Sequence, residues 1–440
     1  MRAPRRSLVA AALAVCLALA GCSLPAVGPA APDGDGSDDR LGYEAGYNAT
    51  DAVSVTTADG YNESEREAVL ARTMARVEEL RGLEFERTVS VELVDRETYR
   101  ARDGPTPGAA QRALTNARWE ALFAVGEDTD ATAAFESVFG SSVIGFYTND
   151  RIVIVSDSET PKLDTRTLAH ELVHALQDQH LGFGPRDRPT FDGARARQGL
   201  VEGDANYVES LYGGRCEVEW DCLAVPERPD APGSVNRGIY ATLIQPYVEG
   251  PAFVRSIHDR GGWTAVNDAY DRFPESTEQT IHPERYPDEP VAEVSVPDRS
   301  ADTWARLDRE RATDRLGEVG VYTMFRTNGL FPEQARYNYS HPVSTGWAGD
   351  RLVPYTNAGS DESAYVWRLE WDSTADAREF ADAYRELLRS KNATLGADGD
   401  AFVIPSGPYA DAFRVTREGS TVTVVNAPDR EALAAVHAEA

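Results

Sequence analysis

The segment TLAHELVHALQDQH, residues 167–180, holds three of the seven histidines of this 440-residue chain. His170 and His174 are four residues apart, so in a helix their rings lie one turn apart on the same face and can reach one ion. Glu171 directly follows the first histidine. In a His-Glu-x-x-His pattern on a helix, the imidazoles hold a metal and the glutamate takes a proton from water that the metal polarises. The spacing predicts a Zn2+ site with Glu171 as the catalytic base.

The residues around the motif favour a buried helix. Apolar side chains surround the histidines on most sides: Leu168, Ala169, Leu172, Val173, Ala175 and Leu176. Polar side chains on such a helix need partners, and a shared ion provides one. Two buried histidines that only form hydrogen bonds are the alternative. We expect the helix to run from Asp164 to His180, with Asp164 or Thr165 as its N-cap.

Two imidazoles hold zinc weakly, so a third ligand is needed. His180 lies six residues after His174, which is the spacing of the last histidine in metzincin peptidases. In that family a glycine after the second histidine lets the helix end and the chain turn, whereas this chain has Gln177 there. If the helix continues through Gln177, His180 points about 120° away from His174 and cannot reach the ion.

Glu202, in GLVEGDANYVESL, is the second candidate and the one we favour. It lies in a helix expected from Ala194 to Leu211, and gluzincins, the class that includes thermolysin, take their third ligand from a glutamate on a following helix. The small residues Gly203 and Ala205 would let two helices pack closely, as a shared ion requires. Three nearby polar residues could orient a ligand histidine through a hydrogen bond: Asp178, Asp204 and Asn206.

A peptidase also needs a donor for the oxyanion that forms when the carbonyl is attacked. The stretch PESTEQTIHPERYPDE, residues 274–289, places Glu278, His282, Arg285 and Tyr286 close together in the sequence. We predict that His282 or Tyr286 is this catalytic donor. A proline-bounded loop that closes the domain is the alternative. The remaining histidines, His258, His341 and His437, have no supporting context and are given no role.

The first residues read as an export signal. Arginines precede an apolar run from Leu8 to Ala20 that is too short to span a bilayer as a permanent helix. The run closes with LAGC, which resembles the lipobox of secreted lipoproteins, so cleavage would leave Cys22 as a lipidated N-terminus. This predicts a signal peptide over residues 1–21 and an exported protein anchored to the cell membrane by lipid and facing outward.

The composition is strongly acidic. Net charge is −28, and only Lys162 and Lys391 among the 44 basic residues are lysines. This bias resembles the proteome of salt-loving archaea, where surface carboxylates keep proteins hydrated. At molar salt the Debye length shrinks to about 3 Å, so the self-repulsion of such a chain largely vanishes. The charge argues against nucleic acid as a partner.

Two cysteines remain beyond the N-terminal region, Cys216 and Cys222 in CEVEWDC. In an exported protein they can form a disulfide, which is the prediction. A metal site is the alternative, but no further cysteine exists to complete a set of thiolate ligands.

The pattern along the chain predicts an α+β fold in two domains. Residues 22–60 are rich in Pro, Gly, Ala and Asp and lack apolar periodicity, as expected of a disordered tether. Residues 61–295 would form the first domain, with a small sheet, the helix of the histidine motif and the glutamate helix. PDEPVAEVSVPD, residues 287–298, marks the boundary, and residues 296–440 would form a smaller α+β domain.

HELVHALQDQ together with EGDA, within residues 163–210, resembles gluzincin-type zinc metallopeptidases. STEQTIHPERY and GWAGDRL are similar to elements of poorly characterised peptidase-like proteins, and the whole chain resembles a family of haloarchaeal surface lipoproteins. The resemblance implies a zincin-like domain with zinc at His170, His174 and Glu202, Glu171 as base, and a peptide or protein substrate. The alternative is a non-catalytic surface lipoprotein, a binding or envelope scaffold with a degenerate peptidase-like domain.

Overall fold

The computed structural model describes residues 40–56, 59–101, 107–139, 145–183, 190–224, 235–307, 312–331, 338–397 and 399–438. This part of the chain combines helices with three sheets in an α+β arrangement, which confirms the predicted fold class. The export signal, Cys22 and most of the expected tether lie outside the described residues. Within the described ranges, every helix is too short or too polar to cross a membrane.

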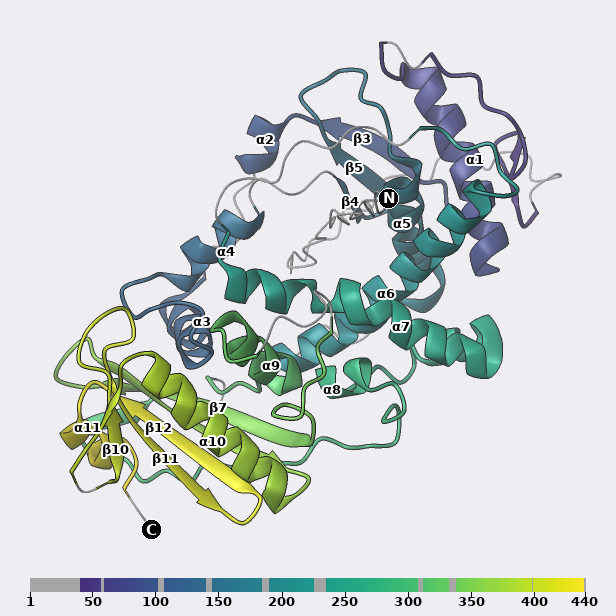
Figure 1. The fold of residues 1–440 in the computed structure, drawn as a ribbon. Coiled ribbons are helices and arrows are strands. Elements are labelled where there is room, and N and C mark those ends of the chain that lie inside the picture. Colours follow the sequence, from purple (N-terminus) through teal and green to yellow (C-terminus); the bar gives the residue numbers. More distant parts are fainter. Residues whose placement is uncertain are drawn as a thin grey trace, which may run out of the picture.

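The helix of the histidine motif packs against a small sheet and two other helices. The sheet has three strands, in this order: β3 (Ser90–Val94), β5 (Arg151–Val155) and β4 (Gly145–Thr148). β3 runs parallel to β5, and β4 pairs with β5 as an antiparallel hairpin. The motif helix, α5 (Thr165–Leu176), follows β5 and shares a core with α1 (Glu63–Arg81) and α6 (Phe191–Cys216) (Figure 1).

The segment before α1 is folded as far back as residue 40. Two short strands, β1 (Tyr43–Glu44) and β2 (Tyr47–Asn48), form a hairpin beside α1. Ala49 is 3% exposed and lies in the core with α1, and its carbonyl accepts a hydrogen bond from Arg76 Nε at 2.7 Å. The prediction of a tether over residues 22–60 is therefore wrong for residues 40–56, which pack against the first domain.

A long helical segment, α7 (Arg237–Asp268), which is kinked at Gly261 and Gly262, was not expected from the sequence. It contains Pro246 and Pro251 and lies along α6 (Figure 1). At the crossing, a Cβ atom added to Gly203 of α6 would lie 2.5 Å from the carbonyl oxygen of Gly250 of α7. No larger side chain fits between these backbones, so the two glycines set how closely α6 and α7 approach.

A seven-stranded antiparallel sheet lies at the other end of the molecule (Figure 1). Its strands have this order: β6 (Trp304–Arg306), β7 (Trp347–Asn357), β8 (Ser363–Trp371), β12 (Thr421–Ala427), β11 (Ala412–Glu418), β10 (Ala401–Val403) and β9 (Thr394–Leu395). α10 (Thr374–Ser390) packs on one face of this sheet and α11 (Arg430–Val436) on the other.

The core beneath α10 extends across the boundary predicted at residues 295/296. Phe123, which follows α3 (Ala109–Ala121), stacks on Phe413 of β11 with ring centroids 5.7 Å apart. Leu243 of α7 is in the same core as α9 (Gly317–Thr327). The sheet does lie in the C-terminal part, but one core joins it to the preceding helices. Three shorter helices are described as well: α2 (Arg96–Arg100), α4 (Ala131–Phe139) and α8 (Thr277–Ile281).

Candidate metal centre

Two histidines of α5 and one glutamate of α6 converge in the core. Asp164 caps α5 by accepting a hydrogen bond from the backbone N–H of Arg166, and every residue from Leu168 to Leu176 is buried. The Nε2 atoms of His170 and His174 lie 3.2 Å apart. Glu202 Oε2 lies 3.3 Å from Nε2 of His170 and 3.4 Å from Nε2 of His174. The three atoms form a nearly equilateral triangle.

This triangle has the dimensions of one face of a zinc site. Metal–ligand distances of about 2.0–2.2 Å in a tetrahedral site put the ligand atoms about 3.3–3.6 Å apart. The three observed separations, 3.2, 3.3 and 3.4 Å, lie at or just below that range. Two imidazole nitrogens and one carboxylate oxygen are also a donor set typical of catalytic zinc, which keeps the fourth position for water. The residues present therefore fit a zinc ion.

The triangle is buried, and the close polar contacts of Glu202 Oε2 are with the two imidazoles of the triangle itself. His170, His174 and Glu202 are 3%, 4% and 4% exposed. Glu202 Oε2 accepts no hydrogen bond among the described residues, and His170 Nδ1 forms none either. An ionised carboxylate without donors is costly to bury. A cation between these side chains removes that cost.

The pKa shifts of His170, His174 and Glu202 also indicate a site that favours positive charge. Burial by itself would lower the pKa of His170, but the carboxylates of Glu202 and Glu209 outweigh it and raise that pKa well above its usual value. Glu202 likewise raises the pKa of His174 against the effect of burial. Burial would raise the pKa of Glu202, but the charges of His174 and His170 lower it to about 2. The Glu202 carboxylate thus stabilises positive charge in this cavity, whether it is carried by protons or by a metal ion.

Gln177 orients one of the two histidines. Its Oε1 atom lies 2.8 Å from Nδ1 of His174, and its Nε2 donates to the Val201 carbonyl at 3.0 Å and to Asp204 Oδ2 at 3.3 Å. Asp204 is in turn held by Arg81, whose Nε lies 3.0 Å from its Oδ1. An Nδ1–H donated to Gln177 leaves the Nε2 lone pair of His174 free for a metal.

The same residue decides between the two candidate third ligands. Gln177 has helical backbone angles, and the chain continues from it as one π-helical turn, Gln177–Leu181. His180 consequently points away from the triangle, and its Nε2 lies 2.5 Å from the carbonyl oxygen of Glu84. The structure brings Glu202 to the motif histidines and does not bring His180 there.

Of the three residues predicted to orient a histidine, Asp204 alone does so, through Gln177. Asp178 accepts a hydrogen bond from the Tyr147 hydroxyl at 2.8 Å, and Asn206 donates to the Glu202 carbonyl at 2.8 Å. Glu209, which sequence reasoning missed, has its Oε2 3.7 Å from His170 Nδ1. It lies seven residues after Glu202, two helical turns along the same face of α6, and this spacing could have identified it.

Glu171 is buried beside the two ligand histidines. It is 1% exposed, and its charge contributes to the raised pKa of both His170 and His174, although less than Glu202 does. Its position directly after His170 turns its side chain about 100° around α5 from that ring. A carboxylate there can take a proton from a water held beside the triangle.

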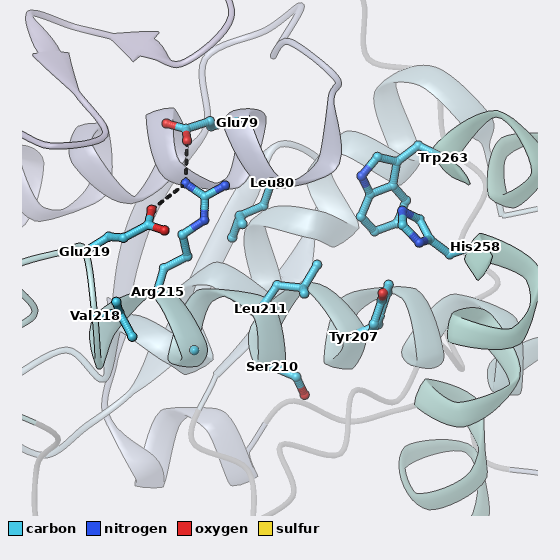
Figure 2. Close-up of a pocket in the computed structure, with 11 residues that line it drawn as sticks. Glu79, Leu80, Tyr207, Ser210, Leu211, Arg215, Val218, Glu219, His258 and Trp263 are labelled. Carbon is cyan, nitrogen blue, oxygen red and sulfur yellow. Dashed lines mark hydrogen bonds and ion pairs between the residues drawn. The ribbon is translucent and has the colours of Figure 1, made fainter. Parts of the chain in front are cut away.

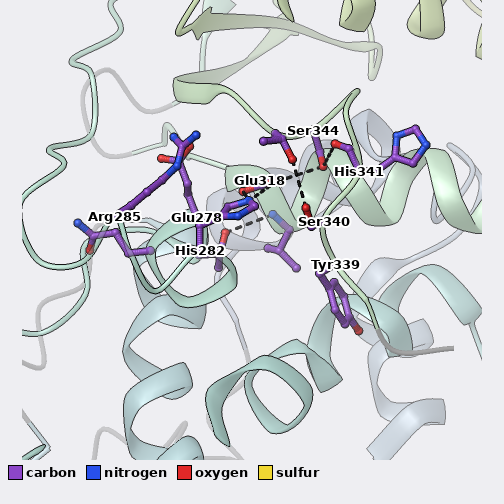
Figure 3. Close-up of polar contacts among 12 residues, drawn as sticks. Glu278, His282, Arg285, Glu318, Tyr339, Ser340, His341 and Ser344 are labelled. Atoms are coloured by element: carbon purple, nitrogen blue, oxygen red, sulfur yellow. Dashed lines mark hydrogen bonds and ion pairs between the residues drawn. The ribbon is translucent and has the colours of Figure 1, made fainter. Parts of the chain in front are cut away.

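The two predicted oxyanion donors lie in other clusters. His282 directs Nε2 to Glu318 at 3.1 Å, and Glu318 also accepts from Ser344 at 3.2 Å (Figure 3). The Tyr286 hydroxyl donates to the Arg272 carbonyl at 2.6 Å. No hydrogen bond, ion pair or ring contact of the described residues joins either side chain to the triangle. These contacts give no support to His282 or Tyr286 as a catalytic donor, and that assignment stays a prediction.

An aromatic residue of α7 lies beside the triangle instead. The ring of Tyr247 is nearly parallel to that of His170, with centroids 6.5 Å apart and an interplanar angle of 19°. Phe183 approaches His174 at a centroid distance of 6.5 Å. Sequence reasoning missed Tyr247 because α7 itself was not expected.

A second group of carboxylates is already paired with the guanidinium of an arginine. The group consists of Glu278, Glu289 and Asp372. Arg285 Nη1 lies 2.5, 3.0 and 3.2 Å from oxygen atoms of these three side chains. The guanidinium stands where a metal ion would have to bind. We assign this group a structural role.

One surface groove of the described part is separate from the triangle. It has a volume of about 470 Å³ and lies between α1, α6 and α7 (Figure 2). Tyr207 and Leu211 form part of its wall, about 140° and about 180° around α6 from Glu202. Arg215 bridges Glu79 and Glu219 at one end. The groove follows the face of α6 that is turned away from the metal ligands.

Cys216 and Cys222 are joined by a disulfide with a Cα–Cα distance of 5.5 Å. The bond closes the turn that follows α6, and both cysteines pack against the core shared by α1 and α5. The structure thus places these residues as a covalent pair and not as ligands of the metal cluster.

Comparison with known proteins gives one family. Residues 305–437 match a domain of unknown function (DUF8575), which covers most of the seven-stranded sheet and none of His170, His174 and Glu202. No curated protein and no solved structure matches the chain.

Replacement of Gln177 by leucine is expected to weaken zinc binding by about 10–100-fold, the usual effect of losing a partner of a ligand histidine. Leucine keeps most of the volume but cannot hold Nδ1 of His174. The dissociation constant is measured by competition with a chromophoric chelator. Gln179→Leu is the matched control, because Gln179 bonds to Glu86 and Arg87 and not to a ligand. An equal loss in both variants would contradict the assigned role.

Proposed function

We propose that the chain is a zinc-dependent hydrolase of the gluzincin type that cleaves peptide bonds. The observation that carries the proposal is the triangle of His170, His174 and Glu202, with its zinc-like spacing and its buried carboxylate oxygen facing two imidazole nitrogens. The adjacent Glu171 adds a general base to the metal ligands. A purely structural zinc site has no need of such a base.

Each residue has a defined task in this proposal. His170, His174 and Glu202 hold the ion, which when bound lowers the pKa of water and polarises a carbonyl group. Glu171 accepts the proton of the attacking water and returns it to the leaving amine. Tyr247, beside His170, is the side chain we put forward as hydrogen-bond donor to the oxyanion, in place of His282 and Tyr286. Gln177 and Asp204 keep His174 in the required orientation.

The proposed location is the outer surface of the cell membrane. It depends on the N-terminal sequence, where the apolar run and LAGC resemble a lipoprotein signal, and on the strongly acidic composition. The membrane would then be a partner through the lipid on Cys22. The substrate would be a peptide or protein outside the cell.

Removal of the metal tests the proposal. The full chain, kept in the salt concentration in which it is folded, is expected to hydrolyse members of a peptide library, to lose this activity on dialysis against a chelator, and to regain it with one equivalent of zinc. Hydrolysis is followed by mass spectrometry of the products. A zinc-loaded, folded chain that cleaves no peptide would contradict the peptidase and favour the non-catalytic surface scaffold.

A further inference from the structure

The second face of the seven-stranded sheet carries a pocket that the proposed hydrolase does not use. At one end of this face, α11 and Val296 pack against the sheet in one core with Val366 of β8 and Val425 of β12. Beyond that cover lies a cavity of about 280 Å³ between the sheet, the segment around Arg299 and the end of α11. The cavity is of a size for a small ligand and not for a folded partner.

Strand register places a row of donors on the floor of this pocket. Thr423 of β12 pairs with Thr416 of β11 on one side and with Arg368 of β8 on the other. Arg414 of β11 lies two residues before Thr416 and therefore points to the same face. All four residues line the pocket. Two guanidinium groups and two hydroxyls thus share one concave surface. Arg414 also donates to the His437 carbonyl, and the Thr416 hydroxyl donates to the Thr423 carbonyl at 3.5 Å.

The pocket is positively charged, although the chain as a whole has a net charge of −28. Arg299 and Arg368 form no ion pair within the described ranges, and Arg368 donates only to the Ser295 carbonyl at 3.2 Å. Arg306, near the same pocket, has an acidic partner, Asp298, at 3.5 Å. Glu418 is the one acidic residue among those that line the cavity. The charges of Arg299 and Arg368 are therefore not neutralised by an ion pair with a described residue.

The pKa of His437 is lowered in part by this excess of positive charge. It is 7% exposed, it lines the pocket, and its Nδ1 atom forms no hydrogen bond among the described residues. Burial and then the nearby arginines, Arg299 and Arg414 first among them, lower the pKa of His437 to about 4. A cleft lined by one sign of charge with low-dielectric walls attracts the opposite ion.

We propose that this pocket binds a tetrahedral oxyanion, a phosphate or sulfate group, either free or as an ester on a small molecule. Guanidinium forks bind such groups through paired hydrogen bonds, and threonine hydroxyls can donate to the remaining oxygen atoms. The floor of the pocket lies within the segment that matches the domain of unknown function. The inference is independent of the metal centre and extends the function to the second end of the molecule.

The test is calorimetric titration of the full chain with sodium phosphate and, separately, with sodium sulfate at constant chloride. Saturable binding of one anion per chain is expected. Because Arg368→Gln removes charge-assisted hydrogen bonds to the anion, it should weaken binding by about tenfold or more. Arg299→Gln should also weaken it, and its exposed side chain makes a folding defect improbable as a cause. Preference between the two salts identifies the anion.

Arg151→Gln is the matched control, since Arg151 is an exposed arginine of the other sheet, paired with Glu92. It should bind the anions as tightly as the unaltered chain. Absence of saturable binding of both anions would overturn the proposal, as would equal binding by Arg368→Gln and the unaltered chain. Glu439 follows directly after Ala438, which lines the pocket. Binding that occurs only in Glu439→Gln would also overturn it, by identifying the ligand as the chain's own carboxylate.

Discussion

Replacement of Glu171 by glutamine is expected to reduce peptide hydrolysis by about 10²–10⁴-fold while zinc remains bound. The amide keeps the size of the side chain but cannot take a proton from water. The three ligands lie elsewhere on α5 and α6, so the ion should stay in place. Activity is measured as kcat/KM on the best peptide, and zinc content is measured on the same samples.

Glu217→Gln is the control, because Glu217 is exposed at the end of α6 and distant in sequence from the motif. It should retain full activity. Loss of zinc along with activity in Glu171→Gln would mean that Glu171 supports the ion and is not the base. Full activity with zinc bound would remove Glu171 from the reaction.

Replacement of Glu202 by alanine is expected to abolish tight zinc binding, a loss larger than the 10–100-fold expected for Gln177→Leu. The change removes the only carboxylate of the triangle. The two buried imidazoles then lack the negative charge that Glu202 places beside them. Two neutral ligands hold zinc poorly, and their positive forms repel it. Activity should fall with the loss of metal.

Thermal unfolding separates this effect from general damage to the fold. A ligand present at about 1,000 times its dissociation constant stabilises a folded protein by about 4 kcal/mol, so zinc should raise the melting temperature of the unaltered chain. Glu202→Ala should show no such increase, whereas Glu217→Ala should behave like the unaltered chain. An increase with zinc in Glu202→Ala would place the ion elsewhere.

Much of the metal centre could be predicted because it depends on local helical geometry. The four-residue spacing fixes His170 and His174 on one face, and the polar residue at 177 indicated that the helix would not turn as metzincins require. Glu202 was harder to predict, since a chain with 72 acidic residues offers many glutamates. Its small neighbours indicated a close helix crossing. The structure shows that Gly203 makes this crossing with α7 and not with α5.

Long-range packing could not be predicted from the sequence. α7 was not predicted because prolines usually end a helix, whereas two prolines lie inside this one. Tyr247 was missed because it belongs to α7. His282 was expected at the metal because polar residues crowd around it in the sequence. Its partner in the structure, Glu318, comes from α9, 36 residues later. Residues 40–56 lack periodicity because a hairpin and single buried side chains, such as Ala49, attach them to α1.

X-ray absorption at the zinc edge, on the full chain purified with zinc and without a metal-binding tag, tests the central claim most directly. We expect one zinc per chain with two imidazole nitrogens and one carboxylate oxygen at about 2.0–2.2 Å, and a weaker imidazole signal or loss of zinc in His170→Ala. A folded chain that takes up no zinc, or a spectrum unchanged by His170→Ala, would contradict the account.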